Sequence, residues 1–548
     1  MFFAQNARTS AVYKTFLDGY TINENGWRAI AGKADGMIKE WWTRINVWRR
    51  VRAARGIGDQ PAAYTPVYVS LTDNMVYFNG KLADTADYVH KELTFCGHKC
   101  ELMYFDNMVD KMVLSEAVLI PLAHAQMPEG LGEGEPFYAW VRDCVLSSSD
   151  QREAFNLEEL EWLMMSGFAV LLIEGYAKAM VFGLQGFKIR GIDEPNMDRL
   201  LRGSREGFVE ALRINIMMMR RRMKTSDLKF ETYVLGKNSK TEVSLAYVKG
   251  AVTNTTLETV RKRLREIDMD IVLASGMIQP FFEEKLTLFS TVGYTERPDT
   301  LCAKLQEGRV GILVDGTPMA IYVPHLFVDN FTSVDDYATG FYYGTFTRVL
   351  KYISFYISVF LPGLYVAVGS FHQELLPTQL LFTLAQSEQN TPFALTFEAL
   401  LMQMIYESLR EAGLRAPRQL GSALNIVGAF LIGQAAVSAG LIGAPMVVIV
   451  SLTATTSLVV PTLYEPGVIM RFAYILLAGM AGFYGIVIGF SFFVVMMCSM
   501  KAYDTPYLSS IAPFDLFAQR DVVFRAPWGI LNRKEYRPQD FKGSDAGQ

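Results

Sequence analysis

The sequence has few cysteines, and their spacing suits neither a disulfide framework nor a metal site. There are five, an odd number too sparse for a secreted disulfide scaffold. Cys96 and Cys100 enclose a Cys-Gly-His-Lys-Cys segment, but no second cluster completes the four ligands of a zinc site. We therefore expect reduced thiols in a strand and its flank, with no metal and no cofactor.

The motifs of common catalytic sites are also absent. The chain has no Gly-x-x-x-x-Gly-Lys-Ser/Thr phosphate loop, no Gly-x-Ser-x-Gly elbow and no His-Glu-x-x-His pair. Its five histidines are scattered along the sequence. Asp315, in Val-Asp-Gly-Thr, could suggest an aspartyl nucleophile, but a hairpin turn explains this string without chemistry. We expect no catalytic residues and no enzyme activity.

Neither sign of charge is in large excess, since 52 Lys and Arg stand against 56 Asp and Glu for a net charge of −4. Such a balance produces no field that would steer nucleic acid, so we expect no nucleic-acid partner. The first residues, MFFAQNARTSAVYK, form only a short apolar start. They do not match a signal peptide, and we expect the N-terminal region to stay on the cytoplasmic side.

Charge is missing altogether from three long stretches, residues 352–373, 419–464 and 472–500. A helix needs about 20 mostly apolar residues to cross the hydrocarbon layer. The first stretch predicts one span, the last predicts one long or tilted span, and the middle one predicts two with a turn at 440–445. Glu465 and Arg471 separate the last two stretches, and we expect them in a loop.

The segment between the first two stretches is ambiguous. Residues 374–413 are largely apolar but contain Glu374, Glu398 and Glu407, so they fit either a fifth, polar span or an amphipathic pair at the interface. The positive-inside rule predicts two different numbers of crossings here. Arg348 and Lys351 put the start of the first span inside, so Arg415 and Arg418 ask for a return to the inside before residue 419, which needs a fifth crossing. The basic tail also prefers the inside, which needs an even number of crossings. We favour four full spans, with this segment embedded without crossing.

One stretch carries the features of a pore helix. Residues 422–441 are rich in Gly, Ala and Ser, which lets helix backbones approach closely. Asn425 lies on one stripe of this helix, and a second stripe consists of Val427, Leu431, Gln434 and Ser438. An interhelical hydrogen bond and a pore role are equally open for Asn425 and Gln434. If the chain forms a ring, we expect the second stripe to line it, with a hydrophobic constriction at Val427 and Leu431.

The first part of the chain repeats itself. Residues 102–122 resemble 245–267, and residues 170–182 resemble 311–323, at offsets of 143 and 141 (245 less 102, and 311 less 170). Each second match places Glu-Gly or Asp-Gly between two apolar runs, which predicts a hairpin. We expect two duplicated cytoplasmic α/β subdomains, each with a strand, two helical stretches and a hairpin, followed by an all-α transmembrane bundle of four to five helices.

The remaining segments flank these domains. Residues 1–63 are a basic Trp/Arg-rich extension that suits a membrane interface, with RNA contact as the alternative. The linker at 187–224 is helical and basic, and suits acidic lipid, a partner or a solvated surface. The tail is polar, and we expect it to be loosely ordered. The domains expected in order are 1–63, 64–186 (first α/β subdomain), 187–224, 225–345 (second α/β subdomain), 346–502 (bundle) and 503–548 (tail).

Several strings together resemble the A-subunit family of GerA-type spore germinant receptors. In the soluble part they are RGSREGFVEALRIN at 202–215, TERPD at 295–299 and EGRVGILVDGTP at 307–318. In the membrane part they are SFHQELLPT at 370–378, EALLM at 398–402, LREAGLR at 409–415 and IGQAAV at 432–437. The matches run in order through roughly residues 90–500, and this ordered set is more specific than any one string.

The resemblance implies a receptor subunit in the spore inner membrane, with its N-terminal domains facing the spore core. Such receptors sense amino acids, sugars or nucleosides and trigger the release of ions and then dipicolinate. It also implies a homo-oligomeric, ion-conducting component in membrane lipid, with a transporter-like B subunit and a lipoprotein C subunit as partners. Two alternatives stay open: an accessory channel of the stage V sporulation AF type, and a membrane-anchored scaffold that conducts nothing.

Overall fold

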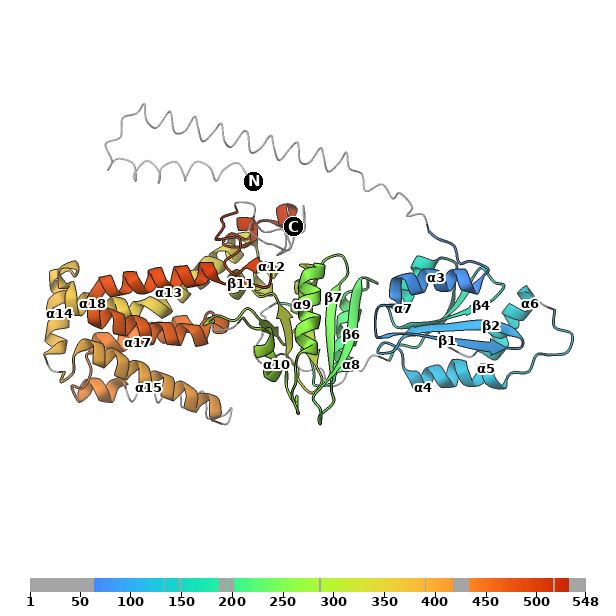
Figure 1. Ribbon diagram of the computed structural model, residues 1–548, viewed down its shortest axis with the longest axis horizontal. Coiled ribbons are helices and arrows are strands. Elements are labelled where there is room, and N and C mark those ends of the chain that lie inside the picture. Colours follow the sequence, from blue (N-terminus) through green and yellow to red (C-terminus); the bar gives the residue numbers. More distant parts are fainter. Residues whose placement is uncertain are drawn as a thin grey trace, which may run out of the picture. The chain divides into compact units, whose positions relative to one another are not determined.

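The computed structural model describes residues 64–132, 134–146, 148, 150–186, 195, 202–284, 287–389, 391–416, 433–515 and 518–531 (Figure 1). The Trp/Arg-rich extension, the start of the linker, Asn425, Val427 and Leu431 lie outside these residues, so the expectations for them stay predictions. Residues 1–65 and 66–548 separate into two units, and the fold below is that of the second unit.

The first α/β subdomain is a five-stranded antiparallel sheet in the order β1-β2-β4-β5-β3. The strands are β1 (Tyr88–Phe95), β2 (His98–Phe105), β3 (Gln151–Ala154), β4 (Phe168–Ile173) and β5 (Ala179–Gly183). The helices are α3 (Leu71–Leu82), α4 (Lys111–Leu114), η1 (Ser115–Leu119), α5 (Ile120–His124), α6 (Glu135–Trp140), η2 (Val141–Val145) and α7 (Leu157–Met164).

Helices cover both faces of this sheet, as the wholly apolar strand β4 requires. Val170 and Leu172 of β4 face the core shared with α3 and α7, whereas Ala169, Leu171 and Ile173 face the core shared with α4 to η2. This alternation follows from the two-residue period of a strand.

The second subdomain has the corresponding strand order, β6-β7-β9-β10-β8, and is also antiparallel. Its strands are β6 (Leu228–Leu235), β7 (Thr241–Val248), β8 (Gly293–Thr295), β9 (Val310–Val314) and β10 (Ala320–Val323). Its helices are α8 (Leu212–Arg222), α9 (Asn254–Arg265), α10 (Ser275–Phe282) and α11 (Pro298–Gln306). Helices α8 and α11 cover one face, and α9 and α10 cover the other.

Both predicted hairpins are confirmed. Glu174-Gly175 joins β4 to β5, and Asp315-Gly316 joins β9 to β10. Gly175 (φ 93°) and Gly316 (φ 83°) adopt the left-handed backbone conformation that a side chain disfavours. The Glu-Gly and Asp-Gly pairs therefore form these turns because their glycines accept a positive φ, as the prediction assumed.

The basic linker helix α8 contradicts the expectation of a lipid-facing, partner-facing or solvated surface. Met217, Met218 and Met219 are buried, and Arg220 is fully buried. The Arg220 guanidinium donates to both carboxylate oxygens of Asp87 at 2.8 Å, and it lies between the rings of Phe105 and Phe230. The expectation is wrong because Asp87, far away in sequence, neutralises Arg220 inside the core that joins the two subdomains.

A short connector at 324–340, which contains η3 (Phe327–Phe331) and α12 (Val334–Ala338), leads into the apolar C-terminal half. In order this half contains α13 (Phe341–Phe371), η4 (Gln373–Leu375), α14 (Thr378–Glu388), α15 (Leu395–Arg415), α17 (Ala444–Ser457), η5 (Pro461–Leu463) and α18 (Tyr464–Ser499). Among the described residues, two helical stretches, Phe341–Phe371 and Pro461–Ser499, are long and apolar enough to cross a membrane, and α17 is a shorter apolar helix.

Helix α18 is not the single long helix predicted for residues 472–500, because the chain reverses at Gly482. This residue has φ 59° and ψ −138°, outside the helical range. Gly485 lies against the backbone of Leu477, and a Cβ at Gly489 would lie 2.8 Å from the Tyr474 ring. A straight helix would separate these pairs by about 12 and 22 Å. The two halves of α18 therefore run antiparallel, folding back beside α13 (Figure 1).

The tail contradicts the expectation of loose order over residues 503–515 and 518–531. It contains β12 (Thr505–Pro506), which pairs with β11 (Lys501–Ala502) just before the tail, and then η6 (Ala518–Asp521) and α19 (Trp528–Leu531). Tyr507 is buried, and its carbonyl accepts a hydrogen bond from the Phe327 backbone N–H at 3.1 Å. Polarity alone misled the prediction, because this segment packs on the connector between the second subdomain and α13.

Candidate functional site: buried charges among the apolar helices

The polar residues expected in the membrane part have different environments. Glu374 is exposed in η4, Glu398 is buried in α15, and Glu407 lies half-buried further along α15. Gln434 and Ser438 belong to a helical stretch at 433–438 and are both exposed. The structure therefore places Glu398 and Glu407 within the helix packing and leaves the described half of the predicted pore stripe facing outward.

Glu407 and Arg471 form a buried ion pair that the sequence analysis missed, because Arg471 was expected in a loop. Arg471 lies instead in the first half of α18 and is only 1% exposed. Its Nη1 lies 3.3 Å from Glu407 Oε1, and its Nε donates to the Ser358 carbonyl of α13 at 2.7 Å. Each charge is thus paired inside an apolar environment, which is the condition for burying one.

Two further donors complete the environment of Glu407. The Tyr464 hydroxyl donates to Oε2 at 2.6 Å, and Gln403 Nε2 donates to Oε1 at 3.0 Å. Tyr464 and Arg471 share one face of α18 at a spacing of seven residues, and Gln403 and Glu407 are four residues apart on α15. The network therefore joins α13, α15 and α18 at one point.

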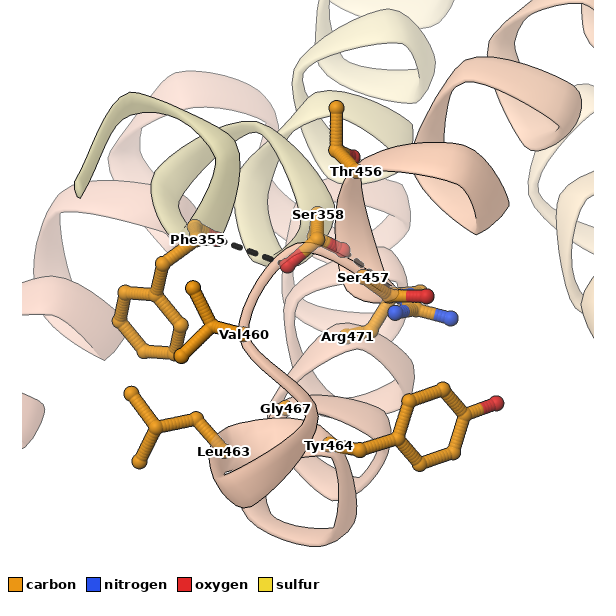
Figure 2. Close-up of a pocket in the computed structure, with 9 residues that line it drawn as sticks. All are labelled: Phe355, Ser358, Thr456, Ser457, Val460, Leu463, Tyr464, Gly467 and Arg471. Carbon is orange, nitrogen blue, oxygen red and sulfur yellow. Dashed lines mark hydrogen bonds between the residues drawn. The ribbon is translucent and has the colours of Figure 1, made fainter. Parts of the chain in front are cut away.

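Figure 2 shows the side of this network that faces α17. Arg471 and Tyr464 line a narrow cavity opposite Phe355, Val460 and Leu463, and the Arg471–Ser358 bond lies along its wall (Figure 2). The cavity is too narrow to hold a water molecule. The network therefore serves as a tightly packed contact between helices, and this cavity has no room for a ligand.

Glu398 joins α15 to α17. Its Oε1 accepts the Gly443 backbone N–H at 2.7 Å, directly before the first residue of α17. A carboxylate is favourable there because the first N–H groups of a helix are unpaired and its N-terminus is partly positive. Oε2 of Glu398 is buried without a hydrogen-bond partner. A Cβ at Gly443 would meet Glu398 Oε1 and Ser387 Oγ at 3.4 Å, which is an ordinary contact distance, so the bond depends on the backbone N–H and not on the absence of a side chain.

The helical stretch that carries Gln434 and Ser438 also has a buried side. Gly433 and Ala436 are buried, and a Cβ at Gly433 would lie 3.4 Å from Val447 of α17. Gly433 and Ala436 therefore lie on the packed side of this stretch, whereas Gln434 and Ser438 are exposed together with Ala435 and Ala439.

A second charged cluster, which the sequence analysis also missed, lies where the second subdomain leads into α13. Arg309 Nη2 lies 2.8 Å and Lys304 Nζ 3.1 Å from Asp329 Oδ1. Burial opposes the charge on Asp329, but Arg309 and Lys304 outweigh burial and hold the pKa of this carboxyl well below its usual range. Arg309 lies in the string at 307–318, which was the only signal available from the sequence.

His325 belongs to the same cluster as a neutral residue. Burial lowers the pKa of His325 to about 4. Its Nδ1 is 3.1 Å from the Tyr322 hydroxyl and its Nε2 is 3.2 Å from Asn330 Oδ1. This network assigns the proton to Nε2, so that Tyr322 donates to Nδ1.

The basic residues in the first turns of α13 form ion pairs with acidic residues from two other segments. Arg348 is fully buried, with Nε 3.3 Å from Asp336 of α12 and Nη1 3.0 Å from Asp521 of the tail. Lys351 pairs with Asp336 at 3.2 Å. Arg348 and Lys351, which suggested an inside-facing helix end, are therefore held in ion pairs.

No metal centre forms within the described ranges, where no three His, Cys, Asp or Glu residues gather closely enough to hold an ion. Cys96 is exposed in the β1–β2 turn, and Cys100 is buried in β2. Burial raises the pKa of the Cys100 thiol to about 12, which opposes the thiolate form that binds metals.

Comparison with known proteins gives these features a family context. The family described as Bacillus/Clostridium GerA spore germination protein matches residues 76–537. Spore germination protein KA of Bacillus subtilis (strain 168) is 35% identical over 493 residues, covering 89% of each chain. Spore germination protein B1 of the same strain is 34% identical, covering 81% of this chain and 92% of that one.

Two further similarities complete the comparison. The uncharacterized membrane protein YfkQ of Bacillus subtilis (strain 168) is 34% identical over 86% of this chain and 91% of its own. The crystal structure of the N-terminal domain of the A subunit of the Bacillus megaterium spore germinant receptor GerK3 aligns with a TM-score of 0.38 and 25% identity, over 48% of this chain and 98% of that chain. Because the family match covers most of the chain and the KA protein is 35% identical along nearly all of it, this chain belongs to the GerA family of spore germination proteins.

Proposed function

We propose that this chain is a membrane subunit of a spore germinant receptor and helps convert nutrient sensing into ion release as an oligomeric ion channel. The observation that carries the proposal is the family match over residues 76–537, joined to two stretches of the described residues that are long and apolar enough to cross a membrane, the second of which folds back at Gly482. The named germination proteins among its relatives support the role in germination.

The pore of this channel would be lined by Val427, Leu431, Gln434 and Ser438 from copies arranged in a ring. Support comes from Gln434 and Ser438, which are exposed although Gly433 and Ala436 of the same helical stretch are buried. In a single chain these polar side chains would face lipid, whereas in a ring they would face water. Val427 and Leu431 would form the hydrophobic constriction.

Within the bilayer, α15 would cross together with the first half of α18, in place of the embedded segment expected earlier. Gly479 of α18 packs against Thr396 at one end of α15, and Tyr464 bonds Glu407 further along. With 21 residues, α15 is about 31 Å long, which matches the hydrocarbon thickness. Its crossing would also put Arg415 on the inside, as the positive-inside rule asks.

The membrane, the orientation and the partner subunits that we propose follow from the receptor family. The chain would reside in the spore inner membrane with its α/β subdomains in the spore core, beside a transporter-like B subunit and a lipoprotein C subunit. We propose no catalytic role for it. We also propose that the two subdomains are duplicated copies of one unit, which their corresponding strand orders and the two sequence offsets support.

An accessory germination channel of the stage V sporulation AF type is the second candidate. YfkQ, a relative of nearly the same identity as KA, is named only as a membrane protein, so similarity alone does not separate receptor subunits from other members. Co-purification from spores distinguishes the two. Recovery with B and C subunits fits a receptor subunit, and recovery without them fits an accessory channel. A membrane-anchored scaffold, the third candidate, would carry no ions whether or not it is recovered with B and C subunits.

The pore assignment is tested by Leu431→Lys in reconstituted liposomes, with Leu414→Lys as a control at an exposed position of α15. A ring of lysines at the constriction should alter the rate or ion selectivity of flux, because charge rings set selectivity in channels. The control should leave both unchanged. Unaltered flux through an assembled Leu431→Lys protein would contradict the assignment.

A further inference from the structure

An exposed apolar stripe runs along α13 and begins before the charge-free stretch of the sequence. Its members are Tyr342, Tyr343, Phe346, Leu350, Ile353 and Tyr356. Their spacing places them along one side of the helix. Arg348 and Lys351 lie in the same turns, but Asp336 and Asp521 hold them in ion pairs. No free charge therefore separates the aromatic start of the stripe from its continuation along the helix.

The C-terminal segment adds to this surface. The Thr345 hydroxyl of α13 accepts the Arg525 backbone N–H at 3.2 Å and lies 3.4 Å from the Arg525 carbonyl. Residues on both sides of this contact expose large apolar side chains: Phe524 is 60% exposed, Trp528 59% and Ile530 45%. We name the combined surface the interfacial patch, and it consists of Tyr342, Tyr343, Phe346, Phe524, Trp528 and Ile530.

Trp528 is held in place although most of its surface is free. Its ring centroid lies 6.0 Å from that of Tyr337, and the Arg525 guanidinium lies 5.5 Å from the same ring. A side chain positioned in this way loses little rotamer freedom when its free face is covered. The contacts therefore hold Trp528 beside α12, where part of its surface lines a cavity with Tyr337 and the rest stays exposed.

We propose that the interfacial patch binds the lipid surface and anchors the segment 518–531 in the headgroup layer beside α13. The patch continues a stripe that leads into an apolar helix long enough to span a bilayer. Tryptophan and tyrosine favour the membrane–water boundary, because an apolar ring and a polar group occupy the two sides of it. In the sequence, Arg533, Lys534 and Arg537 follow the patch, and such charges favour anionic headgroups.

This inference rests on the proposed function only in requiring α13 to cross a membrane, and its test separates the two claims. The full chain would carry Ser in place of the exposed cysteines Cys96, Cys144 and Cys498. One fluorophore would be attached through Trp528→Cys, Tyr356→Cys or Trp162→Cys in separate proteins, and Phe524→Cys would repeat the test independently. Each protein would be placed in vesicles of phosphatidylglycerol and phosphatidylethanolamine brominated at a shallow or a deep chain position.

The fluorophore at 528 should lose emission, and the shallow bromines should quench it more than the deep ones. The label at 356, on the span, should be quenched by deep bromines, and the label at 162, exposed on the first subdomain, should keep its emission. Quenching at 356 without quenching at 528 and 524 would overturn the patch as a lipid-binding surface. If the unlabelled Trp528→Cys and Phe524→Cys proteins instead formed disulfide-linked dimers, the patch would be a contact between copies and not a lipid-binding surface. Absence of quenching at 356 would overturn the membrane crossing itself.

Discussion

At the scale of single residues, the ion pair between Arg471 and Glu407 connects three helices. We expect Arg471→Met to destabilise the protein by up to about 3–5 kcal/mol, because it leaves the half-buried Glu407 carboxylate with only the neutral donors Tyr464 and Gln403. Replacing both residues by Met should recover most of this loss. The readout is the thermal unfolding midpoint in detergent.

Arg415→Met provides the matched control, because Arg415 forms an exposed pair with Glu411 one turn away on the same helix α15. Its effect should stay below about 0.5 kcal/mol. If the two single variants lost equal stability, or if the double variant were less stable than Arg471→Met alone, the buried pair would not have the role assigned to it.

His325 gives the second prediction at this scale. Its pKa is about 4 in the folded protein and about 6.5 in an unfolded chain, so between these values the unfolded chain binds the proton more readily. The free energy of unfolding should therefore fall as the pH drops from about 6.5 to 4, by roughly 3 kcal/mol at most. Asp329, whose pKa is held below its usual value, adds its own loss only at still lower pH.

The pH dependence is measured with His325→Gln, which keeps one donor and one acceptor but does not titrate. The variant should show a flatter unfolding midpoint between pH 6.5 and 4 than the unaltered protein. His124→Gln, at an exposed position, should leave the profile unchanged. Equal slopes in the unaltered protein and the His325→Gln variant would contradict the assignment of this loss to His325.

At the scale of elements, the reversal of α18 depends on Gly482. Gly482→Ala should cost at least about 1–3 kcal/mol, because φ 59° with ψ −138° is unfavourable for a side chain and a Cβ would lie 2.9 Å from His372 Cε1. Gly467→Ala is the control, since its Cβ would meet nothing nearer than 3.8 Å and alanine favours a helix. Thermal midpoints compare the two. A fully stable Gly482→Ala protein would favour one straight helix over residues 464–499.

The same elements show how far sequence reasoning reaches. The hairpins at Gly175 and Gly316 were predictable, because Glu-Gly and Asp-Gly between apolar runs specify a local backbone conformation. The reversal at Gly482 was not, because Gly479, Gly482, Gly485 and Gly489 lie close together and only tertiary packing decides which one turns the chain. Composition likewise located the apolar helices but did not fix how often they reverse.

The candidate site was less predictable than the fold. Glu398 and Glu407 were recognised as polar residues in an apolar region, but their partners were not. Arg471 is 64 residues from Glu407, and Arg220 is 133 residues from Asp87. No local pattern joins residues this far apart. The same reasoning applies to the tail, whose order depends on contacts with the connector and α13.

At the scale of the whole molecule, the tail and the connector join the soluble part to the apolar helices. Tyr503 and Tyr507 contact Phe282 and Phe289 of the second subdomain, and Asp521 binds Arg348 at the base of α13. A change in the second subdomain would therefore reach both α13 and the end of α18. This connection gives the proposed receptor subunit a physical route from its α/β subdomains to its apolar helices.

Ion flux through the purified protein in liposomes, with the oligomeric mass measured in the same detergent, tests the central claim most directly. The channel account predicts a closed oligomer that carries ions, and predicts that Gln434→Ala changes the flux without changing the mass. A stable monomer that carries no ions would contradict the account and would favour a scaffold.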